Sequence, residues 1–220
     1  MAIRIQPSIL SADFVNFQSE FDSIGNADGI HVDVMDGHFV PNMTFGLPMV
    51  RRMQEISTIP LDVHLMLENP DFWAKEYASA GVFSVTVHYE ACENPIDTAK
   101  SIHDCGVRAG ISIKPATSVA VLEDIYQHFD QVLIMSVEPG FGGQSFIIES
   151  LEKIVQAREL LGNSDVWLQV DGGVDESNIK TLAALGADTF VAGSAVFKHS
   201  DRRIAIDTLR RLAIEGEESN

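Results

Sequence analysis

The chain has 220 residues and a formal net charge of -17 at pH 7. This length suits one large domain, and no Ser-, Gly- or Pro-rich stretch marks a linker. The acidic charge argues against nucleic acid and anionic membranes as partners, because both favour basic patches. A small anionic ligand is not excluded, since backbone amides and helix ends can hold a phosphate.

The sequence shows no apolar run long enough to span a bilayer and no leader of the charged, apolar and small-residue type. Its two cysteines, Cys92 and Cys105, have neither metal-knuckle nor disulfide-framework spacing. We therefore expect a cytoplasmic protein. Residues 1–214 are expected to form the domain, and the acidic residues 215–220 a solvated, disordered tail.

Short β-branched runs alternate with segments of helical periodicity along the whole chain. Eight strands are expected, at residues 3–8, 29–35, 61–66, 84–88, 108–114, 132–137, 166–171 and 189–193. Helical spacing is clearest in Phe14-Phe17-Phe21-Ile24, Val119-Leu122-Ile125-Phe129 and Leu151-Ile154-Val155-Leu160. Helix ends before the next strand are expected at Gly81, Gly106 and Gly186.

Eight β/α units in a chain of this length predict an α/β fold, a single-domain TIM (β/α)8 barrel. In such a barrel the chemistry lies at the C-terminal ends of the strands. An open doubly wound sheet is the alternative, but no Gly-x-Gly-x-x-Gly follows the first strand to support dinucleotide binding.

Two neighbouring strands share one polar pattern. Because side chains alternate along a strand, each strand gathers an imidazole, a carboxylate and a thioether on one face: His31, Asp33 and Met35, then Asp62, His64 and Met66. One such strand alone would be better explained by a buried His–Asp hydrogen bond. The repetition favours a metal-capable wall of an active site.

Polar residues also gather where the strands end. The expected C-terminal ends carry His31, Asp33, His64, His88, Lys114, Ser136, Asp171 and Ser194. Three glycine-rich loops follow the last three strands: Pro139-Gly-Phe-Gly-Gly-Gln144, Asp171-Gly-Gly-Val174 and Gly193-Ser194. The loops after strands seven and eight commonly bind phosphate in this fold, together with a short extra helix, for which residues 194–197 are the candidate. A phosphorylated substrate is therefore expected.

Six ordered motifs run along the chain: Pro7-Ser-Ile-Leu-Ser-Ala-Asp-Phe14, His31-Val-Asp-Val-Met-Asp-Gly-His-Phe-Val-Pro-Asn42, Asp62-Val-His-Leu-Met66, Met135-Ser-Val-Glu-Pro-Gly-Phe-Gly-Gly-Gln-Ser-Phe146, Val170-Asp-Gly-Gly-Val174 and Val191-Ala-Gly-Ser-Ala-Val-Phe197. Through these motifs the chain resembles the ribulose-phosphate 3-epimerase family over nearly its whole length. The resemblance implies a metal-dependent barrel enzyme that interconverts D-ribulose 5-phosphate and D-xylulose 5-phosphate, a small phosphorylated ketopentose pair. Since relatives assemble as dimers or larger rings, it also implies a homo-oligomer.

The resemblance further implies the site residues. One divalent metal ion is expected on His31, Asp33, His64 and Asp171. Asp33 would also be the proton acceptor and Asp171 the donor from ribulose to xylulose phosphate, with the labels exchanged in reverse. Substrate contacts are expected from Ser8, His64, Met35, Met66, Met135, Gly140, Phe141, Gly142, Gly143, Gly172, Gly173, Gly193 and Ser194.

The chemistry explains these residue types. Inversion at C3 beside a ketone removes a weakly acidic proton from one face and returns one to the other, so two carboxylates must flank the intermediate. A metal ion acting as a Lewis acid would stabilise the cis-enediolate. Two imidazoles and two carboxylates suit zinc, iron, manganese or cobalt (Zn²⁺, Fe²⁺, Mn²⁺ or Co²⁺) without selecting among them.

Other functions and roles remain open at this stage. The nearest alternative is a hexulose-phosphate epimerase acting on D-allulose 6-phosphate; a non-catalytic phosphate-binding barrel and a Schiff-base aldolase using Lys114 are less favoured. For His88 and Glu90, hydrogen bonds to a ligand residue are favoured over metal ligation. Supporting roles are expected for Asp62, which would orient a neighbour, for Asp36 and His38, which would shape a loop, and for Gln169, where many relatives carry glutamate.

Overall fold

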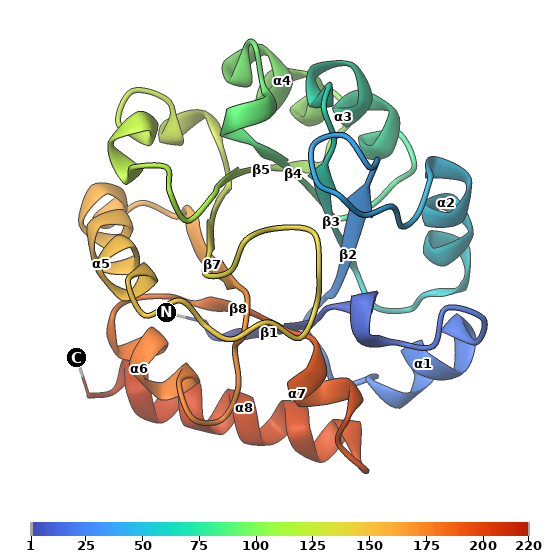
Figure 1. Ribbon diagram of the computed structural model, residues 1–220, viewed down its shortest axis with the longest axis vertical. Helices are drawn as coiled ribbons and strands as arrows, with labels where there is room; N and C mark the ends of the chain where they lie inside the picture. The colour runs from blue at the N-terminus through green and yellow to red at the C-terminus, as the bar shows by residue number, and fades with distance from the viewer. Residues whose placement is uncertain (1, 220) are drawn as a thin grey trace.

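The computed structural model describes residues 2–219, in which eight parallel strands form a barrel (Figure 1). Neighbouring strands pair in the order β1-β8-β7-β6-β5-β4-β3-β2, and a bridge between Ser8 and His31 brings β1 to β2. The strands are β1 (Arg4–Pro7), β2 (Ile30–Met35), β3 (Leu61–Met66), β4 (Ser84–His88), β5 (Arg108–Ile113), β6 (Gln131–Met135), β7 (Trp167–Asp171) and β8 (Thr189–Ala192). The predicted TIM barrel is confirmed.

Helices surround the strands (Figure 1). They are α1 (Phe17–Ser23), α2 (Leu47–Ile56), α3 (Pro70–Ala78), α4 (Pro95–His103), α5 (Ser150–Leu161), α6 (Ile179–Ala184), α7 (Ser194–Phe197) and α8 (Arg202–Glu217). Proline lies in the first turn of α2, α3 and α4, where its missing N–H has no intrahelical partner to lose. The short helix expected at residues 194–197 is present as α7.

Two helical expectations need correction. The segment around residues 119–129 forms only short 3₁₀ turns, η3 (Val119–Leu122) and η4 (Tyr126–His128), rather than an α-helix. Its apolar spacing reflects burial of Val119, Leu122 and Phe129, which successive turns achieve without a continuous helix. The first helix begins at Phe17, so Phe14 precedes it and contacts the Phe17 and Phe45 rings.

The acidic end also differs from the expected disordered tail. Helix α8 continues through Glu217, and Glu215 accepts hydrogen bonds from Lys180 at 3.4 Å and Arg211 at 2.5 Å. Gly216 is buried, and a Cβ at that position would lie 2.1 Å from the Lys180 carbonyl oxygen. Close packing of α8 on α6 therefore orders this segment, while Asn220 lies outside the described residues.

The two faces of the barrel strands carry different residues, as side-chain alternation predicts. Val32, Val34, Val63 and Leu65 pack in the apolar layer between strands and helices. The barrel interior instead holds buried polar groups, among them Gln6, Asp62, Thr86, Gln131 and Gln169. Across residues 2–219, no helix combines the length and the apolar character needed to cross a membrane.

Candidate active site and metal centre

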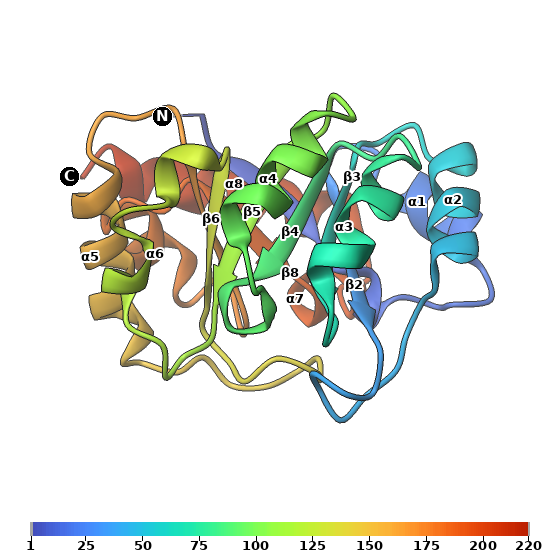
Figure 2. The same ribbon diagram turned by 90° about the horizontal axis from the view of Figure 1, so that it is seen from above.

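A pocket opens at the C-terminal ends of the strands. Figure 2 shows the long loops after β2 and β6 approaching each other at this end, while both chain termini lie towards the other. Asn42 Nδ2 donates a hydrogen bond to the Gly140 carbonyl at 2.8 Å and joins the two loops. The pocket is lined by Ser8, Leu10, Ser11, Asp33, Met35, Met66, Met135, Val137, Pro139, Gly140, Phe141, Gly142, Gly143, Gln144, Asp171, Gly172, Gly173, Val174, Val191, Gly193 and Ser194.

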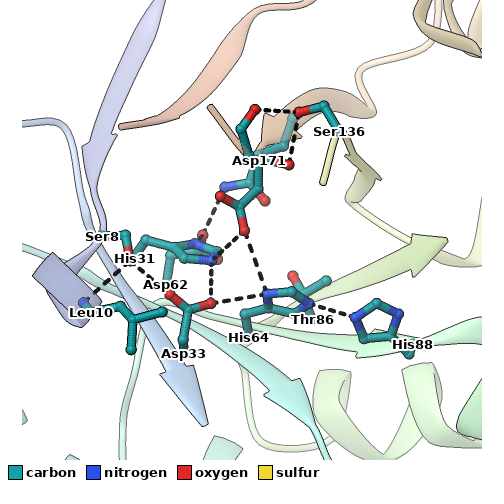
Figure 3. Close-up of polar contacts among 12 residues, drawn as sticks. Ser8, Leu10, His31, Asp33, Asp62, His64, Thr86, His88, Ser136 and Asp171 are labelled. Atoms are coloured by element: carbon teal, nitrogen blue, oxygen red, sulfur yellow. Dashed lines mark hydrogen bonds and ion pairs between the residues drawn. The ribbon is translucent and has the colours of Figure 1, made fainter. Parts of the chain in front are cut away.

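Four side chains converge beside this pocket (Figure 3), and two of them, Asp33 and Asp171, line it. His31 and Asp33 come from β2, His64 from β3 and Asp171 from the end of β7. One potential ligand atom from each lies within 4.8 Å of the other three. The alternation inferred from the sequence thus places both histidines and Asp33 inside the barrel, and closure of the sheet brings Asp171 to them.

The His31 ring is oriented by Asp62. Its Nδ1–H donates to Asp62 Oδ2 at 2.8 Å, and Asp62 also accepts from Ser84 Oγ at 2.6 Å and Gln169 Nε2 at 2.8 Å. His31 Nε2 is buried and makes no hydrogen bond to any described residue. It lies 3.3 Å from Asp33 Oδ1 and 3.7 Å from Asp171 Oδ2. The expectation that Asp62 orients a neighbour matches these contacts.

The two carboxyl groups have opposite pKa shifts. Burial opposes ionisation of Asp33, but the charge of His31, together with the charge and the hydrogen bond of His64, outweighs it, so the pKa of Asp33 lies well below its usual value. Burial raises the pKa of Asp171 to about 6, and the neighbouring Asp33 charge adds to this. Environments that push two carboxyl groups apart in pKa are typical of acid/base pairs.

A divalent cation fits this cluster. Burial alone would lower the pKa of His31, but the charges of Asp33 and Asp62 and the hydrogen bond to Asp62 raise it well above its usual value. The carboxylates therefore favour a positive charge at His31: a proton when no metal ion is bound, or a cation beside the ring. No lysine or arginine appears among the described residues that line the pocket. The orphaned Nε2 atom and the excess of carboxylate suit a bound cation.

Glycines also line the pocket and form what we call the glycine wall: Gly142, Gly143, Gly172, Gly173 and Gly193. Gly172 and Gly173 have φ values of 123° and 65°, and a Cβ on Gly173 would lie 2.5 Å from the Phe146 nitrogen. Only glycine fits this left-handed turn beneath the β6 loop. Ser136 Oγ donates to the carbonyls of Asp171 and Gly172, at 2.9 Å and 2.7 Å, and holds the turn in place.

Several polar residues suggested by the sequence lie outside the cluster. His88 is behind His64, with 2.9 Å between the two Nε2 atoms, and Glu90 contacts His88. Burial lowers the pKa of His88 to about 4. Lys114 Nζ lies over the Phe39 ring, 3.7 Å from its centroid, and lines no part of the pocket. Asp36 accepts the backbone N–H of His38 and therefore shapes the loop after β2.

Other contributors to the pocket were missed in the sequence. Leu10 and Ser11 line it from η1 (Ile9–Ser11), a 3₁₀ turn directly after β1. Ser8 caps this turn through the Leu10 N–H and donates to Asp33 Oδ2 at 2.7 Å. Their position inside the first motif was the available signal, but nothing in the local pattern showed that the turn points into the barrel mouth.

Comparison with known proteins places the chain in a family. A model described as the ribulose-phosphate 3 epimerase family matches residues 4–197. A ribulose-phosphate 3-epimerase of Mycobacterium tuberculosis is 49% identical over 211 residues, covering 95% of this chain and 92% of the relative. That of Bacillus subtilis is 44% identical over 213 residues, covering 94% and 98%.

Solved structures share the fold at low sequence identity. A crystal structure of KGPDC from Streptococcus mutans aligns with a TM-score of 0.72 at 14% identity, covering 97% of this chain and 98% of the other. Orotidine 5'-phosphate decarboxylase from Pyrococcus horikoshii aligns with a TM-score of 0.68 at 15% identity, covering 96% and 99%. The fold thus extends well beyond one activity, whereas the sequence matches are specific: the chain belongs to the ribulose-phosphate 3-epimerase family of enzymes.

Proposed function

We propose that this protein interconverts D-ribulose 5-phosphate and D-xylulose 5-phosphate by inverting C3. The observation that carries the proposal is the pair Asp33 and Asp171, which reach one pocket from β2 and β7 with opposite pKa shifts. Epimerisation needs such a pair, because one base acting on one face only regenerates the starting sugar. The family's relatives carry the name of this activity.

Asp33 is assigned as the proton acceptor in the ribulose-to-xylulose direction. It is held ionised beside the two histidines, and Ser8 Oγ donates to its Oδ2 at 2.7 Å. Asp171 is assigned as the donor on the other face, and burial raises its pKa to about 6 in the metal-free protein. The reverse reaction exchanges the two roles.

The four ligand candidates His31, Asp33, His64 and Asp171 are assigned to one divalent ion, either zinc, iron, manganese or cobalt. When bound, this ion would supply several kcal/mol of stabilisation to negative charge on the intermediate. The buried thioethers of Met35, Met66 and Met135 line the pocket and exclude water from that charge. This protects the intermediate from random protonation.

The substrate phosphate is assigned to the glycine wall. Gly142, Gly143, Gly172, Gly173, Gly193 and Ser194 line the pocket, with Gly140 and Phe141 in the covering loop. Among the described residues, no lysine or arginine lines the pocket that holds Asp33 and Asp171, so backbone N–H groups would hold the phosphate. Lys198 lines an adjoining pocket with Gly142, Gly143 and Ser194. A cytoplasmic homo-oligomer is the proposed setting, and the unpaired Cys92 and Cys105 fit a reducing compartment.

The test is hydrogen exchange at C3. Metal-loaded protein incubated with ribulose 5-phosphate in deuterium oxide should replace the C3 proton by deuterium and form xylulose 5-phosphate. Absence of exchange overturns the proposal and leaves a non-catalytic phosphate-binding barrel. The same assay with allulose 6-phosphate separates the two sugars, since a much larger kcat/KM for the hexulose would reassign the substrate.

A further inference from the structure

The ring of His64 has one nitrogen in the cluster and one outside it. Its Nδ1 lies 3.3 Å from Asp33 Oδ1 and 4.0 Å from Asp171 Oδ2, so this nitrogen faces the carboxylates. Its Nε2 points the opposite way, to His88 Nε2 at 2.9 Å, on the neighbouring strand β4 (Figure 3). His88 therefore contacts the His64 nitrogen that faces away from the cluster.

The His88 ring is enclosed by protein. It is fully buried, and the Phe39 ring covers it at a centroid distance of 4.7 Å. With His88 Nε2 engaged by His64, the remaining Nδ1 lies 3.2 Å from Glu90 Oε2. Both ring nitrogens thus have protein partners, which argues against His88 as a metal ligand.

Glu90 determines which nitrogen donates and which accepts in the contacts that join it to His88 and His64. Its other oxygen, Oε1, accepts the backbone N–H of Lys114 at 2.7 Å and the hydroxyl of Thr117. An ionised carboxylate can only accept hydrogen bonds, so His88 must carry its proton on Nδ1 and donate a hydrogen bond from it to Glu90. His88 Nε2 is then an acceptor, and His64 carries a proton on Nε2. In the metal-loaded protein, His64 Nδ1 would offer a lone pair to the ion in place of its hydrogen bond to Asp33 Oδ1 at 3.3 Å.

We propose that His88 and Glu90 are positioning residues that hold His64 in the tautomer whose Nδ1 binds the metal ion. The inference rests on the proposed metal site and deepens it. His31 is oriented directly by the carboxylate of Asp62, whereas His64 is oriented by a carboxylate one imidazole further away. Such outer partners set the tautomer and geometry of a ligand histidine.

Glu90→Gln is the most informative variant, because it reverses the direction of the contacts. If the amide oxygen keeps the Lys114 N–H and the Thr117 hydroxyl, the amide N–H₂ faces His88 Nδ1. His88 must then carry its proton on Nε2, where it meets the Nε2–H of His64. We expect zinc affinity, measured by competition with a chromophoric chelator, to fall about tenfold, in the range typical of outer-shell changes.

Two further variants separate positioning from packing. His88→Phe keeps an aromatic ring beside Phe39 but removes the acceptor for His64, so zinc affinity should fall at least as far as in Glu90→Gln. His88→Gln supplies an amide oxygen for His64 and an amide N–H for Glu90, so it should recover most of the affinity. Equal losses in the two His88 variants would show that only the shape of the ring matters and would overturn the proposal.

The matched control is a variant at the other end of the barrel. His103 Nε2 contacts Asp130 Oδ2 at 2.9 Å, and Asp130 also accepts the Ala109 N–H. Asp130→Asn therefore removes a carboxylate that bridges a histidine and a backbone amide, as Glu90→Gln does, but far from the cluster. We expect its zinc affinity to equal that of the unmodified protein.

A direct readout needs no activity. Long-range proton–nitrogen NMR on the zinc-loaded protein with labelled histidine should show His64 protonated at Nε2 and His88 at Nδ1. The reverse pattern at His88 overturns the inference. Failure of the proposed function looks different: the unmodified protein would then bind no metal or show no C3 exchange. An unmodified protein that binds zinc and exchanges C3, with an unchanged affinity in Glu90→Gln, refutes the inference alone.

Discussion

At the N-terminal end of the barrel, arginines and carboxylates neutralise one another within the chain, whereas at the C-terminal end two carboxylates face two histidines. Asp188, just before β8, accepts from Arg158 at 2.9 Å and from Arg4 at 3.3 Å. The guanidinium groups of Arg4 and Arg108 lie 3.6 Å and 3.8 Å from the centroid of Trp167. The buried carboxylate of Asp188 is thus paired with two arginines.

The cluster of His31, Asp33, His64 and Asp171 is not balanced in this way. His31 Nε2 has no hydrogen-bond partner among the described residues, and Asp171 ionises only with difficulty beside Asp33. A buried carboxylate without a cation is costly, so a protein retains one where a ligand or a reaction uses it. The comparison teaches that carboxylates with no lysine or arginine among the described residues of the pocket beside them, rather than the number of charged residues, distinguish the reactive end of this barrel.

The largest expected effect comes from Asp171→Asn. The amide keeps the shape of the side chain but cannot transfer a proton, so kcat for epimerisation should fall about a thousandfold. Enzyme-coupled detection of xylulose 5-phosphate measures this. Asp188→Asn, at the balanced end, is the control and should retain kcat. Undiminished turnover in Asp171→Asn would refute its assignment as a proton carrier.

Removal of metal should have the next largest effect. Treatment with a strong chelator should lower kcat at least about a hundredfold, since several kcal/mol of charge stabilisation are lost. The melting temperature should also fall, because an ion that binds only the folded state stabilises it. Adding back zinc, iron, manganese or cobalt separately should restore both quantities to different extents. Full activity after exhaustive chelation would exclude the metal assignment.

Arg158→Ala probes the N-terminal end of the barrel, where Asp188 is paired with arginines. It leaves the buried Asp188 with Arg4 as its remaining arginine partner, so the free energy of unfolding should fall by about 3 kcal/mol. Urea denaturation measures this loss, and kcat per folded molecule should stay unchanged. A drop in kcat without a loss of stability would contradict the division between the two ends.

The smallest expected effect concerns the metal-free protein and pH. Because the pKa of Asp171 is raised to about 6, the folded state favours the neutral carboxyl group. The stability from this preference is fully present below the unfolded pKa of about 4 and is lost as pH rises through the folded value near 6. Asp171→Asn stays neutral, so in chelator its free energy of unfolding should exceed that of the unmodified protein by about 3 kcal/mol near pH 8.

This advantage should disappear below about pH 4, where both proteins carry a neutral group at this position. Urea denaturation in chelator across the range measures it. With metal bound, Asp171→Asn should instead be the less stable protein, because a ligand carboxylate is missing. An advantage that does not change with pH would show that the Asp171 carboxyl group is not strained by its surroundings.

Much of the site was readable from local patterns. The alternation of side chains correctly grouped His31 with Asp33 and Asp62 with His64, because a strand has a strict period of two. The expected strand limits lie within two residues of the observed ones, because β-branched runs between turn residues are strong signals. The segment around Val119 was misjudged as an α-helix, because burial alone produces helical spacing without a helix.

The sequence by itself determined the eight-unit barrel, the metal-capable strands and the glycine loops, since each follows from short-range periodicity and backbone conformation. The family resemblance had already joined Asp171 to His31, but local patterns did not show that they meet, and only the tertiary structure gives their contacts. Closure of the sheet brought Asp171 of β7 to His31 and turned His88 away from the cluster towards Glu90. Distances between strands depend on the curvature of the whole barrel, which no local pattern contains.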